Sequence, residues 1–217
     1  SKFSVNSIGT AVIDGMTIGQ CSVVSNGSIT VEPGDLAYPA LTIDIPRNGY
    51  DNDVLTLVSI DNGGTAQGSD IERLTLFKDD GNGTFDGFHQ EIFVSDLYFT
   101  GDRWIASGLN VPLNGIVTRF HVTAEISDYP VSGRTLIAGI PINGIEVQSG
   151  NDGPIDGHID GVDTLTILSS EGIYAEALPI ESQRLIPGEL SEALLAIQLS
   201  NDYPVSIEMD SLILTVL

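Results

Sequence analysis

Residues 116–127 read Ile-Val-Thr-Arg-Phe-His-Val-Thr-Ala-Glu-Ile-Ser, and this stretch decides the fold. Its apolar side chains share one parity: Phe120, Val122, Ala124 and Ile126. Its polar side chains share the other: Arg119, His121, Thr123 and Glu125. Successive residues of a strand point to opposite faces of a sheet, so one face is buried and the other faces water. We therefore predict a half-buried strand with His121 exposed to solvent.

Shorter runs of the same kind surround this strand. They cover residues 41–45, 54–60, 71–78, 91–98, 103–106, 135–142, 144–147 and 163–168. Turn-forming pairs such as Asn114-Gly115 and Asn143-Gly144 separate them at short intervals. Many short strands with frequent turns predict an all-β protein, an antiparallel β-sandwich of the Ig-like or jelly-roll type.

The charge of the chain excludes two classes of partner. The 217 residues include 30 acidic and 8 basic side chains, which gives a net charge of −22. Such a surface repels nucleic-acid phosphates and anionic lipid headgroups. It also repels itself, so a divalent cation that neutralises part of the charge would stabilise the fold. A salt-adapted organism is the alternative explanation, because high salt screens the same repulsion.

Disulfide bridges and membrane insertion are not expected. Cys21 is the only cysteine and is predicted to be a small buried thiol. No apolar run approaches the roughly 18 residues that a transmembrane helix requires. The hydrophobic fraction of 41% is enough to form a sizeable core without covalent crosslinks.

A short motif near the start of the sequence recurs near its end. Pro33-Gly-Asp-Leu36 recurs as Pro187-Gly-Glu-Leu190, which stands 154 residues later, and the alternating run 41–45 recurs in register as 195–199. An offset of this size fits one sandwich domain. We predict three parts: an N-terminal extension strand in residues 1–19, a β-sandwich domain in 20–168 and a partial second β unit in 169–217.

The two ends of the chain favour assembly between copies. Residues 3–13 predict an imperfect half-buried strand, with these apolar side chains on one parity: Phe3, Val5, Ala11 and Ile13. Residues 193–217 predict an unfinished sheet, with these apolar side chains on one face: Leu195, Ile197 and Leu199. A free strand and an open sheet in one chain predict a homopolymer formed by strand exchange, with residues 3–13 as donor and 193–217 as acceptor.

Three alternatives to strand exchange remain open. Residues 3–13 are equally compatible with a first strand of their own domain. The partial second unit could pack on the first domain and enlarge it. It could also be part of a longer repeat protein.

An acidic loop follows the run 71–78. Residues 79–86 read Asp-Asp-Gly-Asn-Gly-Thr-Phe-Asp. Calcium takes six to eight oxygen ligands from tight loops of this kind. We therefore predict a structural Ca²⁺ held by Asp79, Asp80, Asn82, Thr84 and Asp86. His89 stands where the bidentate glutamate of an EF-hand is expected, so Asp79 or Glu91 would have to replace it; the alternative is an acidic hairpin turn without a metal.

A second acidic loop lies in residues 151–163. Its carboxylates stand near alternating glycines: Asp152, Asp156, Asp160 and Asp163. They form a second candidate calcium site. Asp-Gly pairs are also ordinary turn residues, so a loop without a metal is the competing interpretation.

The region around the first acidic loop carries a family resemblance. It comprises Ser-Ile-Asp-Asn-Gly-Gly-Thr at 59–65, Ser-Asp-Ile-Glu-Arg-Leu-Thr-Leu-Phe-Lys-Asp at 69–79 and Gly-Asn-Gly-Thr-Phe-Asp at 81–86. These segments, and more loosely 122–128, resemble the Ig-like domains repeated in large bacterial and archaeal surface proteins. The resemblance covers roughly residues 30–168. It implies a secreted β-sandwich used for display, adhesion or assembly, often with a structural calcium in the loop.

The motifs sought for catalysis are absent from the sequence. It has no Gly-x-Ser-x-Gly elbow, no His-Glu-x-x-His and no phosphate-binding loop. We predict a non-catalytic extracellular structural subunit that forms a filament or surface layer by β-strand exchange and is stabilised by calcium. The alternative is a glycan-binding or spacer domain of a large multidomain adhesin. Aromatic side chains that could stack on a glycan are Tyr50, Tyr98, Phe99, Trp104 and Tyr129, although core packing is favoured for Trp104.

Overall fold

The computed structural model describes residues 15–35, 38–47, 52–169, 173–180, 187–188, 195–201 and 211. Contacts divide the chain into two compact units, Ser1–Leu168 and Ser169–Leu217. The division falls at the residue where the sequence repeat predicts a second β unit to begin.

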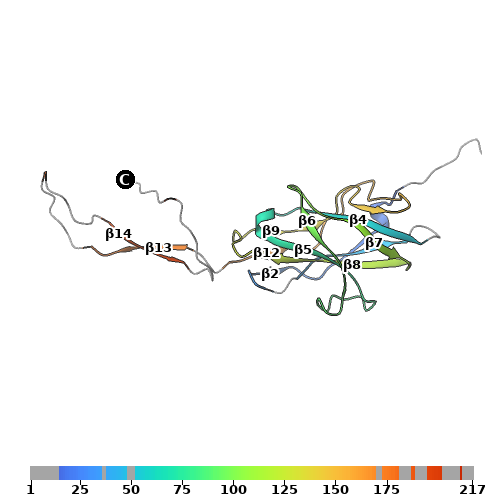
Figure 1. Cartoon of the computed structure of the whole chain (residues 1–217), viewed down its shortest axis with the longest axis horizontal. Coiled ribbons are helices and arrows are strands. Elements are labelled where there is room, and N and C mark those ends of the chain that lie inside the picture. The colour runs from blue at the N-terminus through green and yellow to red at the C-terminus, as the bar shows by residue number, and fades with distance from the viewer. Residues whose placement is uncertain are drawn as a thin grey trace, which may run out of the picture. The chain divides into compact units, whose positions relative to one another are not determined.

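The first unit consists of short strands joined by turns (Figure 1). Its strands are β1 (Ser22–Val24), β2 (Ile29–Val31), β3 (Tyr38–Pro46), β4 (Asp53–Asn62), β5 (Ile71–Lys78), β6 (Ile92–Phe99), β7 (Trp104–Leu113), β8 (Val117–Ile126), β9 (Thr135–Leu136), β10 (Ala138–Gly139), β11 (Ile145–Val147) and β12 (Leu165–Ile167). The helical elements among the described residues are two 3₁₀ turns, η1 (Ile18–Gln20) and η2 (Gly68–Asp70). The predicted all-β, sandwich-like fold is confirmed.

One long antiparallel sheet provides most of the fold. Its strand order is β1-β3-β8-β5-β6-β7-β4-β10, and β11 also pairs with β4. The sheet curls over between β6 and β7, which pair only at Tyr98↔Ile105 and Phe99↔Trp104. A small sheet β2-β12-β9 contributes a parallel pairing between β2 and β12, which departs from the otherwise antiparallel arrangement of the described strands.

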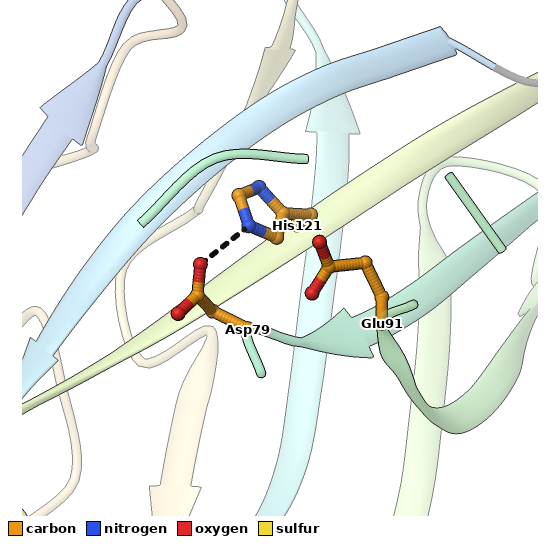
Figure 2. A group of neighbouring side chains, drawn as sticks. All are labelled: Asp79, Glu91 and His121. Atoms are coloured by element: carbon orange, nitrogen blue, oxygen red, sulfur yellow. Dashed lines mark hydrogen bonds and ion pairs between the residues drawn. The ribbon is translucent and has the colours of Figure 1, made fainter. Parts of the chain in front are cut away.

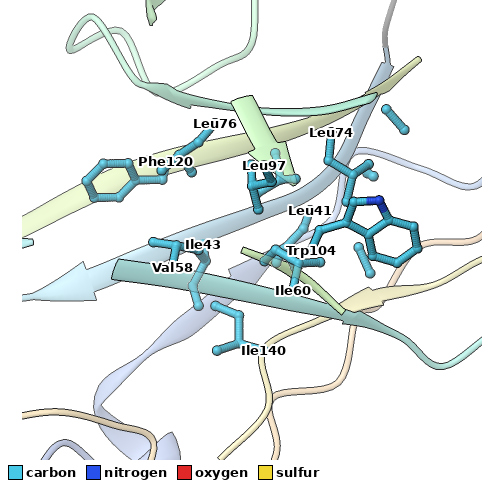
Figure 3. Packing of buried hydrophobic residues seen from close by; sticks show 14 of the residues in the cluster. Leu41, Ile43, Val58, Ile60, Leu74, Leu76, Leu97, Trp104, Phe120 and Ile140 are labelled. Atoms are coloured by element: carbon cyan, nitrogen blue, oxygen red, sulfur yellow. The ribbon is translucent and has the colours of Figure 1, made fainter. Parts of the chain in front are cut away.

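The core lies inside the curled sheet. Figure 3 shows side chains of β3, β5 and β8 meeting those of β4 and β7. Phe120 and Val122 of β8 are fully buried, as the alternating pattern predicts. Trp104 of β7 is 3% exposed, so the prediction that it packs in the core is confirmed.

The opposite face of β8 differs from the prediction. His121 is only 1% exposed and Thr123 is fully buried, so the prediction that His121 is solvated is wrong. The residues that cover this face come from the loop 79–91, which joins β5 to β6. The Phe85 ring of this loop makes an edge contact with the His121 imidazole, with centroids 5.5 Å apart, and also contacts Phe77. A second, smaller apolar layer therefore forms outside the sheet.

Residues 15–20 belong to the first unit. Met16 is 3% exposed; its N–H donates to the Asp152 carbonyl at 2.8 Å, and its carbonyl accepts from the Ile155 N–H at 2.9 Å. The Cys21 thiol lies 3.2 Å from the Met16 sulfur and is half-buried. Burial, with a smaller contribution from Asp156, raises the pKa of this thiol to about 11, so it is a poor nucleophile at neutral pH. The predicted donor residues Phe3, Val5, Ala11 and Ile13 lie outside the described residues.

The second unit contains one described strand pair. β13 (Ile173–Leu178) and β14 (Ala196–Asn201) are antiparallel, with Leu178 opposite Ala196 and Ala177 opposite Ile197. Leu195 and Leu199 are 51% and 40% exposed. Of the predicted acceptor sheet, residues 193–194, 202–210 and 212–217 lie outside the described residues.

The pairing register of the second unit repeats that of the first. In the first unit β1 pairs with β3, with Val24 opposite Thr42 and Val23 opposite Ile43. Adding the sequence offset of 154 residues to these positions gives the pairs Leu178↔Ala196 and Ala177↔Ile197 of the second unit. The sequence repeat and the strand register therefore agree on the same offset.

Candidate metal centre

Three potential metal ligands meet where the loop 79–91 leaves and re-enters the sheet. Asp79 directly follows β5, Glu91 directly precedes β6, and His121 lies in the middle of β8. Strand β5 lies between β8 and β6 in the sheet, and Phe77 is the partner of His121. This register brings both ends of the loop to the imidazole, and Figure 2 shows the three side chains pointing toward one another.

The three side chains form a compact and buried group. One ligand atom from each of Asp79, Glu91 and His121 lies within 4.8 Å of the others. The side chain of Asp79 is 8% exposed, Glu91 is 5% exposed and His121 is 1% exposed. Two ionised carboxylates shielded from water at this separation repel each other unless a positive charge lies between them.

Hydrogen bonds hold the carboxylates in place without saturating them. Asp79 accepts the backbone N–H of Gly81 at 2.7 Å and of Gly83 at 3.0 Å. The two oxygens of Glu91 accept the backbone N–H groups of Asp80 and Asp86, each at 3.2 Å. A carboxylate oxygen has two lone pairs, so each Glu91 oxygen retains acceptor capacity for a cation.

The hydrogen-bond chain behind His121 orients its ring. The Thr42 hydroxyl donates to the Asn26 side-chain oxygen at 3.1 Å, so it accepts from Nδ1–H of His121 at 2.8 Å. In the neutral ring, Nε2 then presents a lone pair toward Asp79 Oδ2, which lies 3.4 Å away. Two facing lone pairs repel, so this contact requires either a proton on Nε2 or a cation between the two atoms. Metal-binding histidines commonly have their other ring nitrogen fixed in this way.

Arg119 anchors the middle of the same loop. Its guanidinium donates to both carboxylate oxygens of Asp44, at 2.7 and 2.9 Å, and to the Gly83 carbonyl. The hydrogen bond from Arg119 lowers the pKa of Asp44 below its usual value. Gly83 has a φ of 86°, and a Cβ there would lie 3.2 Å from Arg119 Nη1, so a glycine suits this contact.

The predicted calcium ligands divide into two groups. Asp79 belongs to the buried cluster, whereas Asp80, Asn82, Thr84 and Asp86 are exposed. The exposed members bond mainly to one another: the Asn82 amide donates to Asp86 at 2.8 Å, and its oxygen accepts the Thr84 N–H at 2.7 Å.

The sequence predicts the two remaining members of the cluster, Glu91 and His121, to different extents. Counted from Asp80 as position one, Glu91 stands at position twelve, where an EF-hand has its glutamate, so the assignment of that position to His89 is wrong. The sequence does not identify His121 as a ligand, because its position in the alternating pattern of β8 predicts a solvent-exposed side chain. Among the described residues, no other group of three potential ligands has its ligand atoms all within 4.8 Å of one another.

The carboxylates of the second acidic loop each have separate roles. Asp152 accepts the Val147 N–H at 2.8 Å and Asp156 accepts the Ile18 N–H at 2.8 Å. Asp163 accepts the Ser25 hydroxyl and the Asn26 N–H. The Asp160 side chain is 92% exposed beside His158. Three of the four carboxylates thus serve as backbone anchors for different segments.

The described aromatic side chains among the glycan-binding candidates differ in burial. Trp104 is buried, whereas Tyr98 is 73% exposed and Tyr129 is 47% exposed. Phe99 packs against Trp104 with centroids 4.8 Å apart and borders a cavity of about 460 Å³. Tyr50 lies outside the described residues. Glycan binding stays a prediction, and among the described residues the glycan would have to bind in this cavity.

Comparison of the chain with protein-family models found no match, and comparison with curated proteins found none either. The resemblance to Ig-like surface domains therefore stays a prediction from the sequence. Within the described ranges, no helix has the length and apolar character needed to cross a membrane.

Proposed function

We propose that the chain is a non-catalytic structural module of an extracellular surface assembly, built from repeated β-sandwich units. The recurrence of one strand register at an offset of 154 residues carries this proposal. An isolated two-stranded hairpin is marginally stable in water, so β13 and β14 need further strands to bury a face. Repetition of one unit along a chain is how extended structural proteins gain length.

The closed character of the metal centre supports a structural role over catalysis. A catalytic metal keeps a coordination position open to substrate, whereas a structural metal is enclosed by protein. The side chains of Asp79, Glu91 and His121 are almost completely buried, and the Phe85 ring covers the imidazole. A metal here would fasten the loop 79–91 to the sheet without meeting a substrate.

The ligand set favours a borderline divalent ion such as Zn²⁺. One imidazole nitrogen and two carboxylates are common zinc ligands, whereas calcium takes six to eight oxygens. The predicted Ca²⁺ would need Asp80 and Asp86 to turn inward from their exposed positions. Either ion would offset part of the net charge of −22.

The cell exterior is the compartment that best fits these features. The acidic surface disfavours nucleic acid and membrane surfaces as partners. The repeated sandwich and the lack of catalytic motifs fit display, adhesion or assembly.

Labelling of intact cells tests this proposal. Antibodies raised against the purified chain should label the surface of unpermeabilised cells of the organism that makes it. A cytoplasmic antigen probed in parallel controls for leakage. Labelling that appears only after permeabilisation would rule out the extracellular role.

A further inference from the structure

The seam between β6 and β7 leaves two strand edges open. The two strands pair only next to their connecting turn, at Tyr98↔Ile105 and Phe99↔Trp104. Beyond that point β6 pairs with β5 and β7 pairs with β4. Among the described residues, the edges of β6 and β7 that face each other have no ladder partner. A groove of about 490 Å³ lies between them.

The floor of this groove is part of the hydrophobic core. Val94 of β6 and Leu109 and Val111 of β7 pack against the core but remain partly exposed. At the rim, Ile92 is 53% exposed and Phe93 is 59% exposed. Core side chains left half-covered between two open edges are the expected result of a missing strand.

We infer that this groove accepts residues 1–13 of a second copy as an added strand. This inference rests on the proposed assembly function. An inserted strand would extend both ladders and cover the half-exposed core residues. An added strand would also cover Phe93, which is 59% exposed. The groove is the acceptor in this inference because its facing edges are unpaired and its apolar floor is half-exposed.

Charge favours this occupant. A net charge of −22 makes two copies repel over most of their surfaces. None of the residues that line the groove is acidic. Residues 1–13 contain no Asp or Glu and carry Lys2. Both surfaces of the proposed contact therefore lack the carboxylates that make two copies repel each other elsewhere.

Length and pattern also fit. A strand advances about 3.3 Å per residue, so residues 1–13 exceed the open stretch from Ile92 to Leu97. Phe3 and Val5 share a parity and would point to the groove floor, whereas Ser4 and Asn6 would point to solvent.

The test compares paired substitutions of opposite parity in the full chain. F3D/V5D places charges against the apolar floor, and S4D/N6D adds the same charge on the outward face. The measurement is the solution mass by light scattering over a range of concentrations. We expect wild type and S4D/N6D to assemble above 23.0 kDa. F3D/V5D should require on the order of a hundredfold higher concentration, because burying an unpaired carboxylate costs several kcal/mol.

A mixing experiment identifies the acceptor. S107E/N110E charges two exposed groove residues and keeps the donor, whereas F3D/V5D keeps the groove. At concentrations where wild type assembles, neither variant should assemble alone, and their mixture should form a heterodimer by native mass spectrometry. No heterodimer, or equal assembly of F3D/V5D and S4D/N6D, would overturn the inference.

The remaining outcomes separate this inference from the proposed function. A wild-type mass of 23.0 kDa at every concentration would overturn strand exchange. Surface labelling of intact cells would then still support a structural module. A monomeric F3D/V5D variant with a lower unfolding temperature than a monomeric wild type would show that residues 1–13 fill the groove of their own chain, and would overturn the second copy as source.

Discussion

The two faces of β8 are stabilised by different physical means. The inner face carries Phe120 and Val122, which are fully buried in the core. The outer face carries Arg119, His121 and Thr123, of which the last two are just as deeply buried but polar. Burial of the inner face is favourable by itself. Burial of the outer face is favourable only if its hydrogen bonds and charges find partners.

The stability of the inner face should therefore not depend on ions, whereas the attachment of the loop 79–91 to the outer face should depend on them. The loop 79–91 holds to the outer face through Arg119, the Phe85 ring and the cluster around His121. Metal and pH should therefore change the outer face and leave the inner face nearly unchanged. Substitutions on each face, studied with and without metal and at different pH values, test this contrast.

Truncation on the inner face should cost the most and should be independent of metal. We expect F120A to lower the free energy of unfolding by about 3–5 kcal/mol, through lost burial and the cavity left behind. The measurement is chemical unfolding with and without a chelator. A loss that shrinks markedly in the chelator would contradict the separation of the two faces.

Removing a ligand from the outer cluster should abolish the stabilisation by metal. A divalent ion at 100 times its Kd raises the free energy of unfolding of wild type by about 2.7 kcal/mol. E91Q and H121Q should lose this increase, whereas D86N, which neutralises an exposed loop carboxylate, should keep it. Thermal unfolding with Zn²⁺, Ca²⁺ and a chelator provides the measurement.

The pattern of responses also identifies the ion. A response to Ca²⁺ that D86N abolishes would favour the five-oxygen loop site over the cluster. Equal melting temperatures of wild type in all three conditions would exclude a structural metal from both sites.

The ion pair between Arg119 and Asp44 should make the outer face sensitive to acid. Asp44 has a lowered pKa in the folded state, so its contribution is present above its unfolded value of about 3.9 and is lost as the pH falls through the folded value. R119M should be destabilised by about 1.5–3 kcal/mol at pH 7. The difference from wild type should shrink below about pH 4. Unfolding curves at several pH values measure it, and a constant difference would exclude the ion pair as the cause.

The alternating pattern predicts the inner face of β8 well because core burial follows strand parity. The same rule fails for His121, since the loop that covers it comes from residues 79–91 and leaves no trace in the pattern of β8 itself. Asp79 and Glu91 are recognisable as oxygen ligands by their loop, but the cluster depends on the pairing of β8 with β5, a long-range register. The groove between β6 and β7 is equally hidden, because it forms only where the sheet curls and the two strands diverge.

Two buried threonines provide the finest comparison. Thr75 and Thr123 stand directly opposite each other on β5 and β8. The Thr75 hydroxyl donates to Asp96 at 2.9 Å, whereas the Thr123 hydroxyl has no hydrogen-bond partner. T75V should therefore cost about 1 kcal/mol, and T123V should be neutral or stabilising, because valine has nearly the same shape and removes an unsatisfied buried group. Chemical unfolding of both variants measures the difference, and a T123V variant as unstable as T75V would show that polar partners on the outer face matter less than packing.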